Sequence, residues 1–177
     1  LQYKIPESQE TKLEISIDSQ NCRRYTGRTI RNFKVGPSPA WVVEHLTAIG
    51  ERSINNIVDA SNIVMYNCGQ PTHAFDLKKL ASEKIIISDA TVEEDFPVVG
   101  SDNFVAKIKP GDLCICDTEK VLALAGIKGG TNSGISIDAP YTTDILIEVA
   151  NFNATQIRKT GQRLGLYSDA RKRFENN

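Results

Sequence analysis

The alternation of hydrophobic and polar residues changes along the chain, and its first part predicts extended segments followed by a helix. Apolar and polar residues alternate over residues 12–17 (KLEISI), which is typical of a half-buried strand. Residues 25–35 are expected to be extended as well. Ser38 is then expected to cap a helix whose first residue is Pro39 and which stops at Gly50. Apolar residues recur at helical spacing at Val42, Val43, Leu46 and Ile49.

The middle of the chain predicts one more helix and then a set of short strands. The helix is expected over residues 53–67, with Ile57, Val58, Ser61 and Val64 on one face. An acidic loop is expected over residues 92–103, and a tight hairpin over residues 117–120. The β-rich runs are separated by Gly, Pro and Asp turns and cover residues 84–90, 112–117, 120–126 and 144–150.

Two helices are expected near the end of the chain. Asn153 is placed to cap a helix that runs to Leu164 and is closed by Gly165. The last helix is expected to start at Ser168 or Asp169. The pattern as a whole predicts an α+β fold, with a largely antiparallel or mixed β core and a few flanking helices.

Composition restricts the class of protein but not its activity. The 177 residues suit one ordinary domain or two small ones, and 40% apolar with 24% charged residues excludes a disordered or collagen-like chain. Neither a membrane-spanning run nor a secretion signal is recognised, so we expect a cytoplasmic protein without a membrane. Four cysteines without metal-ligand spacing, and only two histidines, predict reduced, mostly buried thiols and no metal site. The cysteines are Cys22, Cys68, Cys114 and Cys116.

Charge is distributed unevenly although the net charge is only −1. Residues 21–36 hold five basic residues and no acid, and residues 151–177 hold six basic residues against two acids. The centre, residues 37–150, is strongly acidic. The two basic segments can meet and form a patch for phosphates, or they can be solvated helix faces and strand edges.

The first candidate for chemistry lies in the segment GQPTHAFD, residues 69–76. Gly-Gln-Pro cannot continue a helix, so it predicts a rigid turn that leaves His73 at its exit. Histidine titrates near neutral pH, so His73 can orient a water or a carbonyl. Taken alone, the residues favour the alternative, a structural histidine that caps a helix end or satisfies a buried carbonyl.

Two further candidates are a glycine-rich segment and a carboxylate on a strand. Residues 123–130 (ALAGIKGG) allow a ligand to approach backbone N–H groups, although they match neither a Walker loop nor a dinucleotide fingerprint and also fit a hairpin end. Glu148 shares a strand face with Leu146 and Ala150, so its carboxylate needs a partner in a partly apolar place. That partner is either a ligand or a nearby arginine.

These segments closely resemble the bacterial phenylalanyl-tRNA synthetase β subunits. The resemblance runs from Cys22 to Glu175 through INNIVDASNIVMYNCGQPTHAFDLKKL, ALAGIKGG, ILIEVANF and RLGLYSDARKRFE in family order. It implies that residues 21–177 form the editing domain, an interleaved module of the third and fourth domains of that subunit. Residues 1–20 are expected to be a strand-rich lead-in from the preceding region.

The resemblance also implies an activity and partners. The family's β subunit pairs with an α subunit in an α2β2 assembly that attaches phenylalanine to its tRNA with ATP and magnesium. This portion would carry no cofactor and would hydrolyse the ester of tyrosine wrongly attached to phenylalanine tRNA. The alternative is a tRNA-docking or structural module that has no turnover of its own.

Site residues carry over position by position from the same resemblance. Glu148 would accept the hydroxyl of tyrosine, Gly129 would offer its N–H at the same end of the pocket, and His73 would place a water or the terminal ribose near the ester. The remaining residues would line the pocket, and they are Arg52, Asn55, Asn56, Ser168 and Ala170. The chain departs from the family pattern at Thr72, Lys128 and Ser168 and in its terminal RFENN. Lys128 replaces a customary apolar residue and so changes the polarity expected at the pocket mouth.

Overall fold

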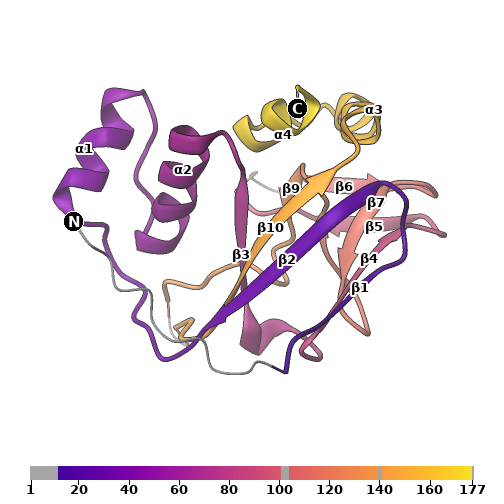
Figure 1. Cartoon of the computed structure of the whole chain (residues 1–177), viewed down its shortest axis with the longest axis horizontal. Helices are drawn as coiled ribbons and strands as arrows, with labels where there is room; N and C mark the ends of the chain where they lie inside the picture. The colour runs from indigo at the N-terminus through magenta and orange to yellow at the C-terminus, as the bar shows by residue number, and fades with distance from the viewer. Residues whose placement is uncertain (1–11, 101–103, 139–140, 177) are drawn as a thin grey trace.

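The computed structural model describes residues 12–100, 104–138 and 141–176. Within these ranges two sheets pack against each other, and helices lie at one edge and one end of them (Figure 1). The fold is α+β, as the sequence predicts. None of the described helices has the length and apolar character that crossing a membrane requires.

The larger sheet is mixed and forms one wall of the core. Its order is β1-β4-β7-β8-β9, with β1 parallel to β4 and the other neighbours antiparallel. The strands are β1 (Glu14–Ile17), β4 (Lys84–Asp89), β7 (Leu113–Cys116), β8 (Val121–Leu124) and β9 (Lys128–Gly129). A separate antiparallel pair is formed by β5 (Glu94–Pro97) and β6 (Val105–Ile108).

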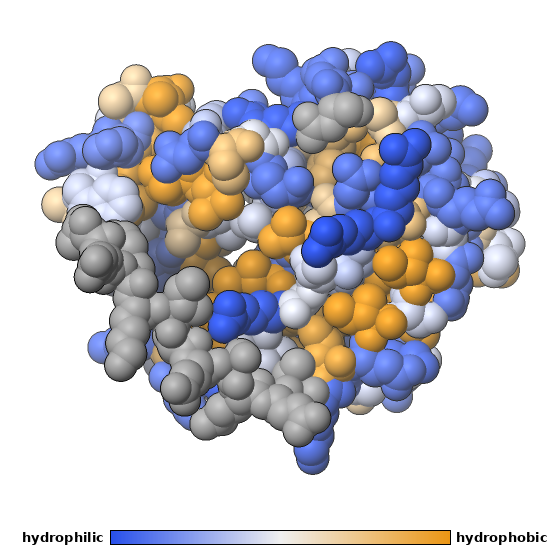
Figure 2. Space-filling view, in the orientation of Figure 1, coloured by the Kyte–Doolittle hydropathy of each residue, from blue (hydrophilic) through white to orange (hydrophobic). Residues whose placement is uncertain are grey.

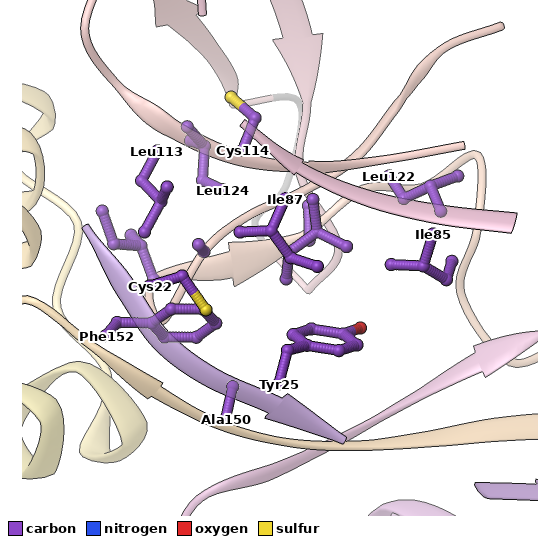
Figure 3. Packing of buried hydrophobic residues seen from close by; sticks show 14 of the residues in the cluster. Cys22, Tyr25, Ile85, Ile87, Leu113, Cys114, Leu122, Leu124, Ala150 and Phe152 are labelled. Atoms are coloured by element: carbon purple, nitrogen blue, oxygen red, sulfur yellow. The ribbon is translucent and has the colours of Figure 1, made fainter. Parts of the chain in front are cut away.

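The smaller sheet is antiparallel and carries the candidate histidine and carboxylate. Its order is β2-β10-β3, built from β2 (Cys22–Ile30), β10 (Ile145–Phe152) and β3 (Thr72–Asp76). On β10 the side chains of Leu146, Glu148 and Ala150 are buried while Ile147 and Val149 are half-buried, as the period of two predicts. This buried face meets the larger sheet in a single hydrophobic cluster (Figure 3).

The helices form two pairs. The pair α1 (Ala40–Ala48) and α2 (Asn56–Cys68) lies beside the smaller sheet, and the pair α3 (Ala154–Leu164) and α4 (Asp169–Glu175) lies at one end of the molecule (Figure 1). Asn153 caps α3 and Ser168 caps α4 with their side chains, and Gly165 closes α3 in a left-handed conformation. The predicted Asn153 cap, the stop at Gly165 and the start of the last helix at Ser168 or Asp169 are confirmed.

The expected start of each helix in the first pair is wrong. Helix α1 begins at Ala40 with Pro39 as N-cap, because the Ser38 hydroxyl binds Asp59 instead of the helix end. Helix α2 begins at Asn56, since Asn55 accepts hydrogen bonds from the N–H groups of Ile57 and Val58. The buried face of each helix includes fewer residues than expected, because Ile49, predicted on the apolar face of the first helix, and Val64, predicted on that of the second, are exposed.

Two other expectations are corrected. The acidic segment before residue 100 contains the strand β5 in place of a loop, because Phe96 and Val98 point into the core while Glu94 and Asp95 stay exposed; residues 101–103 lie outside the described ranges. Cys68 is exposed, unlike the buried Cys22 and Cys114, and all four cysteines are free. The hairpin at residues 117–120 is confirmed by the hydrogen bond from Asp117 N–H to the Lys120 carbonyl.

The two basic segments meet in space, but they differ in how far acids neutralise them. They come together where β2 pairs with the end of β10, which leads into α3. Four arginines of the second segment form ion pairs: Arg158, Arg163, Arg171 and Arg173. In the described part of the chain no ion pair involves the exposed Arg23, Arg24 and Arg28 of β2, and hydrophilic residues lie along this strand in Figure 2.

Candidate functional site

A pocket lies at the end of the two sheets that α4 covers. Strands β3, β8, β9 and β10 supply its walls, and Ala170 and Phe174 of α4 close one side. Most of the lining is apolar, including Leu124 and Ile127. Three residues of the lining have ionisable side chains: His73, Lys128 and Glu148. An apolar pocket with a few convergent polar groups is the usual form of a small-ligand site.

Glu148 places a carboxylate in the apolar wall. Its side chain is 5% exposed, and its Oε2 atom accepts a hydrogen bond of 2.9 Å from the Tyr25 hydroxyl. Burial raises the pKa of Glu148 to about 7, and the Tyr25 hydrogen bond opposes that rise. The arginine partner that the sequence left open is not there, since no ion pair among the described residues involves Glu148.

His73 is the direct cross-strand neighbour of Glu148 in the smaller sheet. It belongs to β3, where it pairs with Glu148 of β10, and so it is not in a loop as expected. The Nε2 atom is buried and has no hydrogen-bond partner within the described structure, while the ring stands edge-on to Phe75 with centroids 4.5 Å apart. Burial, helped by the charge of Lys128, lowers the pKa of His73 to about 4. The imidazole is therefore neutral at physiological pH, with one nitrogen available to a ligand or a water.

Gly129 is required by the close approach of β9 to the histidine. A Cβ atom at this position would lie 2.7 Å from Cε1 and 2.8 Å from Nε2 of His73. Real Cβ atoms essentially never come so close, so any side chain here would push the imidazole away. The sequence pointed to this glycine through the glycine-rich segment, and the structure shows a steric reason for it.

The structure brings four of the predicted site residues together in the pocket lining: His73, Gly129, Glu148 and Ala170. The other four lie outside that lining. Arg52 is exposed in the segment between α1 and α2, and Asn55 caps α2. Asn56 bonds the Gly36 N–H and the Lys34 carbonyl. Ser168 caps α4 and also contacts the carbonyl of Ile127, which does line the pocket.

Two residues that the sequence did not single out belong to this region. Phe174 of α4 lines the pocket. Tyr25 of β2 lies outside the lining and donates a hydrogen bond to the carboxylate of Glu148. The alternation of β2 puts Tyr25 on an inward face, but only the strand register shows which carboxylate it meets. The described residues contain no group of three or more His, Cys, Asp or Glu side chains arranged to hold a metal ion.

Comparison with known proteins assigns the family. The B3/4 domain matches residues 21–177. The chain is 44% identical over 158 residues to the phenylalanine–tRNA ligase β subunit of Syntrophotalea carbinolica, which covers 89% of this chain and 19% of that protein. It is 44% identical over 171 residues to the corresponding subunit of Geobacter metallireducens, covering 97% of this chain and 21% of that protein.

A solved structure has the same fold. An N-terminal fragment of the phenylalanyl-tRNA synthetase β subunit from Pyrococcus horikoshii superposes with a TM-score of 0.58 at 12% identity, covering 92% of this chain and 51% of that one. The chain thus spans about a fifth of the length of its curated relatives. These matches confirm the resemblance seen in the sequence motifs, and the chain belongs to the B3/4 domain family, in the form found in phenylalanine–tRNA ligase β subunits.

Proposed function

We propose that this chain is the editing module of a phenylalanine–tRNA ligase β subunit, which hydrolyses the ester of tyrosine wrongly attached to phenylalanine tRNA. The observation that carries the proposal is the buried carboxylate of Glu148, which has a single hydrogen-bond donor within the described ranges and faces an apolar pocket. A carboxylate in such a place gains from a second donor. The phenolic hydroxyl of tyrosine is a donor of the right kind, held on a ring that suits apolar walls.

The same arrangement explains why phenylalanine would be spared. A pocket shaped for phenylalanine rejects an added hydroxyl only about 10²-fold, because the two side chains differ by one small group. A site that must hydrogen-bond the hydroxyl can reject the analogue without it by about 10⁴- to 10⁵-fold. Glu148 would supply that requirement, and Gly129 lines the same pocket.

The chemistry requires a positioned water. The Nε2 of His73, buried at the pocket and without a hydrogen-bond partner in the described structure, can bond a water or a ribose hydroxyl beside the ester, since the neutral imidazole accepts or donates according to its tautomer. The water oxygen bonds to the ester carbonyl carbon, and the bond from that carbon to the ribose oxygen breaks. A proton from the water ends on the ribose oxygen, so free tyrosine and an intact tRNA are released. No protein nucleophile enters this scheme.

The rest of the enzyme would contribute the first reaction and the assembly. We propose that an α subunit in an α2β2 assembly attaches phenylalanine with ATP and magnesium, in the cytoplasm, and that the aminoacylated tRNA end reaches the pocket described here. The relatives' name, phenylalanine–tRNA ligase β subunit, supports this proposal.

The test is release of tyrosine from phenylalanine tRNA that carries it. The protein at its full natural length should release free tyrosine, and Glu148→Ala or His73→Ala should reduce the rate about 100-fold or more, in line with the loss of a positioned group. Matched controls are Glu44→Ala and His45→Ala, because both side chains are exposed and neither belongs to the pocket lining. Equal rates in the pocket variants and the controls would contradict the proposal.

A tRNA-docking module remains the second candidate, and the exposed arginines of β2 favour it. If the chain docks tRNA without turnover, phenylalanine tRNA binds and tyrosine stays attached. Replacing Arg24 and Arg28 by alanine would then weaken binding and reduce its dependence on salt, because fewer phosphate contacts release fewer counterions. The editing proposal predicts that Glu148→Ala leaves this binding unchanged.

A further inference from the structure

Among the described residues, Tyr25 is the one hydrogen-bond donor to the Glu148 carboxylate. The two side chains come from positions 123 residues apart, and their hydroxyl and Oε2 atoms are 2.9 Å apart. Tyr25 is 6% exposed and lies outside the pocket lining. Figure 3 shows its ring extending from β2 into the core, in the space between the two sheets. The tyrosine therefore contacts the carboxylate from the protein interior, on the side away from a ligand.

The strand register leaves Tyr25 as the residue of β2 that can reach this carboxylate. Glu148 stands directly opposite Gly27, while Tyr25 stands opposite Ala150, so the two polar side chains are diagonal neighbours on one face. Gly27 has no side chain to offer, and a Cβ there would lie 2.6 Å from the Leu13 side chain and 2.9 Å from that of Leu146. This crowding excludes a side chain at position 27, directly opposite Glu148. The Tyr25 hydroxyl is therefore the group of β2 that donates to the carboxylate.

We propose that Tyr25 is the positioning residue of the site, which fixes Glu148 through Oε2 in its ionised form and leaves Oε1 for the hydroxyl of the ligand. This inference rests on the proposed editing function and assigns a residue to it. Tyr25 does not touch the ligand, so it acts only through Glu148.

The electrostatics of the surroundings agree with this role. Burial raises the pKa of Glu148 to about 7, and the bond from Tyr25 is what opposes the rise. Burial and the neighbouring carboxylate raise the pKa of Tyr25 well above its ordinary value, so the hydroxyl remains a donor. Without that donor the carboxyl would take up a proton at higher pH and would stop being a pure acceptor for a phenol.

Few other groups near the carboxylate change charge near neutral pH. Cys22 of β2 has a pKa raised to about 11 by burial, and His73 of β3 has a pKa lowered to about 4 by burial. The remaining charged group in the lining is Lys128 of β9, and the α4 residues that face the pocket, Ala170 and Phe174, do not titrate. Among the protein groups described around the pocket, the one expected to titrate between these values is Glu148, so the limb that differs between Tyr25→Phe and the unsubstituted protein reports on Glu148.

The experiment is the pH profile of tyrosine release by Tyr25→Phe in the protein at full natural length. A hydrogen bond to a charged group is worth enough to move a pKa by about one unit or more. We expect the acidic limb of the single-turnover rate to move up by about one pH unit, so that the variant is about tenfold slower below the limb and approaches the unsubstituted rate above it. Tyr66→Phe is the matched control, since Tyr66 also donates to a glutamate, Glu51, but outside the pocket.

A second readout separates this inference from the editing function. The carboxyl stretching band of Glu148 can be isolated as the infrared difference between the protein and Glu148→Gln, without any substrate. Tyr25→Phe should make the protonated band persist to higher pH, whether or not tyrosine is released. If no tyrosine is released but the band shifts, the editing proposal fails and the positioning role stands. If release is normal and neither the limb nor the band moves in folded Tyr25→Phe, the positioning role is overturned.

Discussion

Two buried carboxylates in this molecule, Asp59 and Glu148, are held in opposite ways. Asp59 is 0% exposed and accepts hydrogen bonds from the hydroxyls of Ser38 and Ser53, each at 2.5 Å, and from the N–H of Ile54 at 2.8 Å. Burial alone would raise its pKa, but these bonds together bring it below the ordinary value. Glu148 has one donor, and burial keeps its pKa at about 7.

The difference shows how a structural carboxylate can be told from a functional one. Asp59 uses its acceptor capacity inside the protein, where it ties the segment before α1 and the segment before α2 to the start of α2. Glu148 keeps part of that capacity for the pocket. The folded structure is therefore stabilised by the charge of Asp59, whereas it tolerates the charge of Glu148, and each prediction below tests that contrast.

The largest effect is expected from Asp59→Ala. The substitution leaves two hydroxyls and one N–H without their acceptor, so we expect the free energy of unfolding to fall by about 4 kcal/mol. Urea denaturation followed by circular dichroism measures it. Glu148→Gln in the same measurement should not lower stability at neutral pH and should raise it by up to about 3 kcal/mol, because it removes a buried charge. A larger loss in Glu148→Gln than in Asp59→Ala would reverse the comparison.

The pH dependence of stability should separate Glu148 from His73. The folded pKa of Glu148, about 7, lies above the ordinary value of 4.5, so its contribution to stability is lost as pH rises between the two. The folded pKa of His73, about 4, lies below 6.5, so its contribution is lost as pH falls through that range. The two contributions nearly cancel in the unsubstituted protein.

Glu148→Gln removes one side of this balance. Its free energy of unfolding should rise by about 3 kcal/mol between about pH 4.5 and pH 6.5, at about 1.4 kcal/mol per pKa unit, while the unsubstituted protein changes far less. Denaturation at a series of pH values provides the measurement, with Glu44→Gln as the exposed control. A profile for Glu148→Gln parallel to that of the unsubstituted protein would show that Glu148 titrates normally.

Gly129→Ala should affect the pocket more than the fold. The new methyl group would lie within 2.8 Å of the imidazole of His73, so either β9 or the ring must move. Overpacking of this size costs about 2 kcal/mol, and displacement of His73 should abolish most tyrosine release. Gly36→Ala is the matched control, because a Cβ there meets nothing within 4 Å. Normal release in folded Gly129→Ala would mean that the position of His73 is unimportant.

The caps of the helices show how far local sequence predicts the fold. Asn153 caps α3 as expected, and α4 starts at Asp169 as expected, with Ser168 as its cap. The Ser168 hydroxyl donates to the Ile127 carbonyl, and its oxygen still accepts from the N–H of Arg171 at the helix start. Ser38 and Ser53 have the same local preference, but both hydroxyls bind Asp59. The helix starts therefore moved to later residues. The start of each of these two helices depends on where the Asp59 carboxylate lies in the folded protein. The local sequence around Ser38 or Ser53 does not reveal that position.

Local patterns marked single residues of the pocket lining but not their arrangement, and four of the eight predicted site residues lie outside that lining. The period of two placed Glu148 on the buried face, and the glycine-rich segment marked Gly129. That His73 stands opposite Glu148, and Tyr25 beside it, depends on the register of three strands from distant parts of the chain. Register is set by packing over the whole sheet, so a single strand's pattern cannot supply it.

The smallest effect is expected from Lys128→Ile, which tests a charge that acts across the pocket without a hydrogen bond. Burial is the larger cause of the lowered pKa of His73, and Lys128 is the smaller one. Removing the cation should therefore raise the pKa of His73 by less than about one unit, measured from the NMR shift of its Cε1 proton. The exposed Lys159→Ile should not move it. A rise to the ordinary histidine value would mean that Lys128, and not the apolar wall, keeps the imidazole neutral. The pocket would then depend on a charge partner, as Asp59 depends on its donors, and its contrast with Asp59 would be lost.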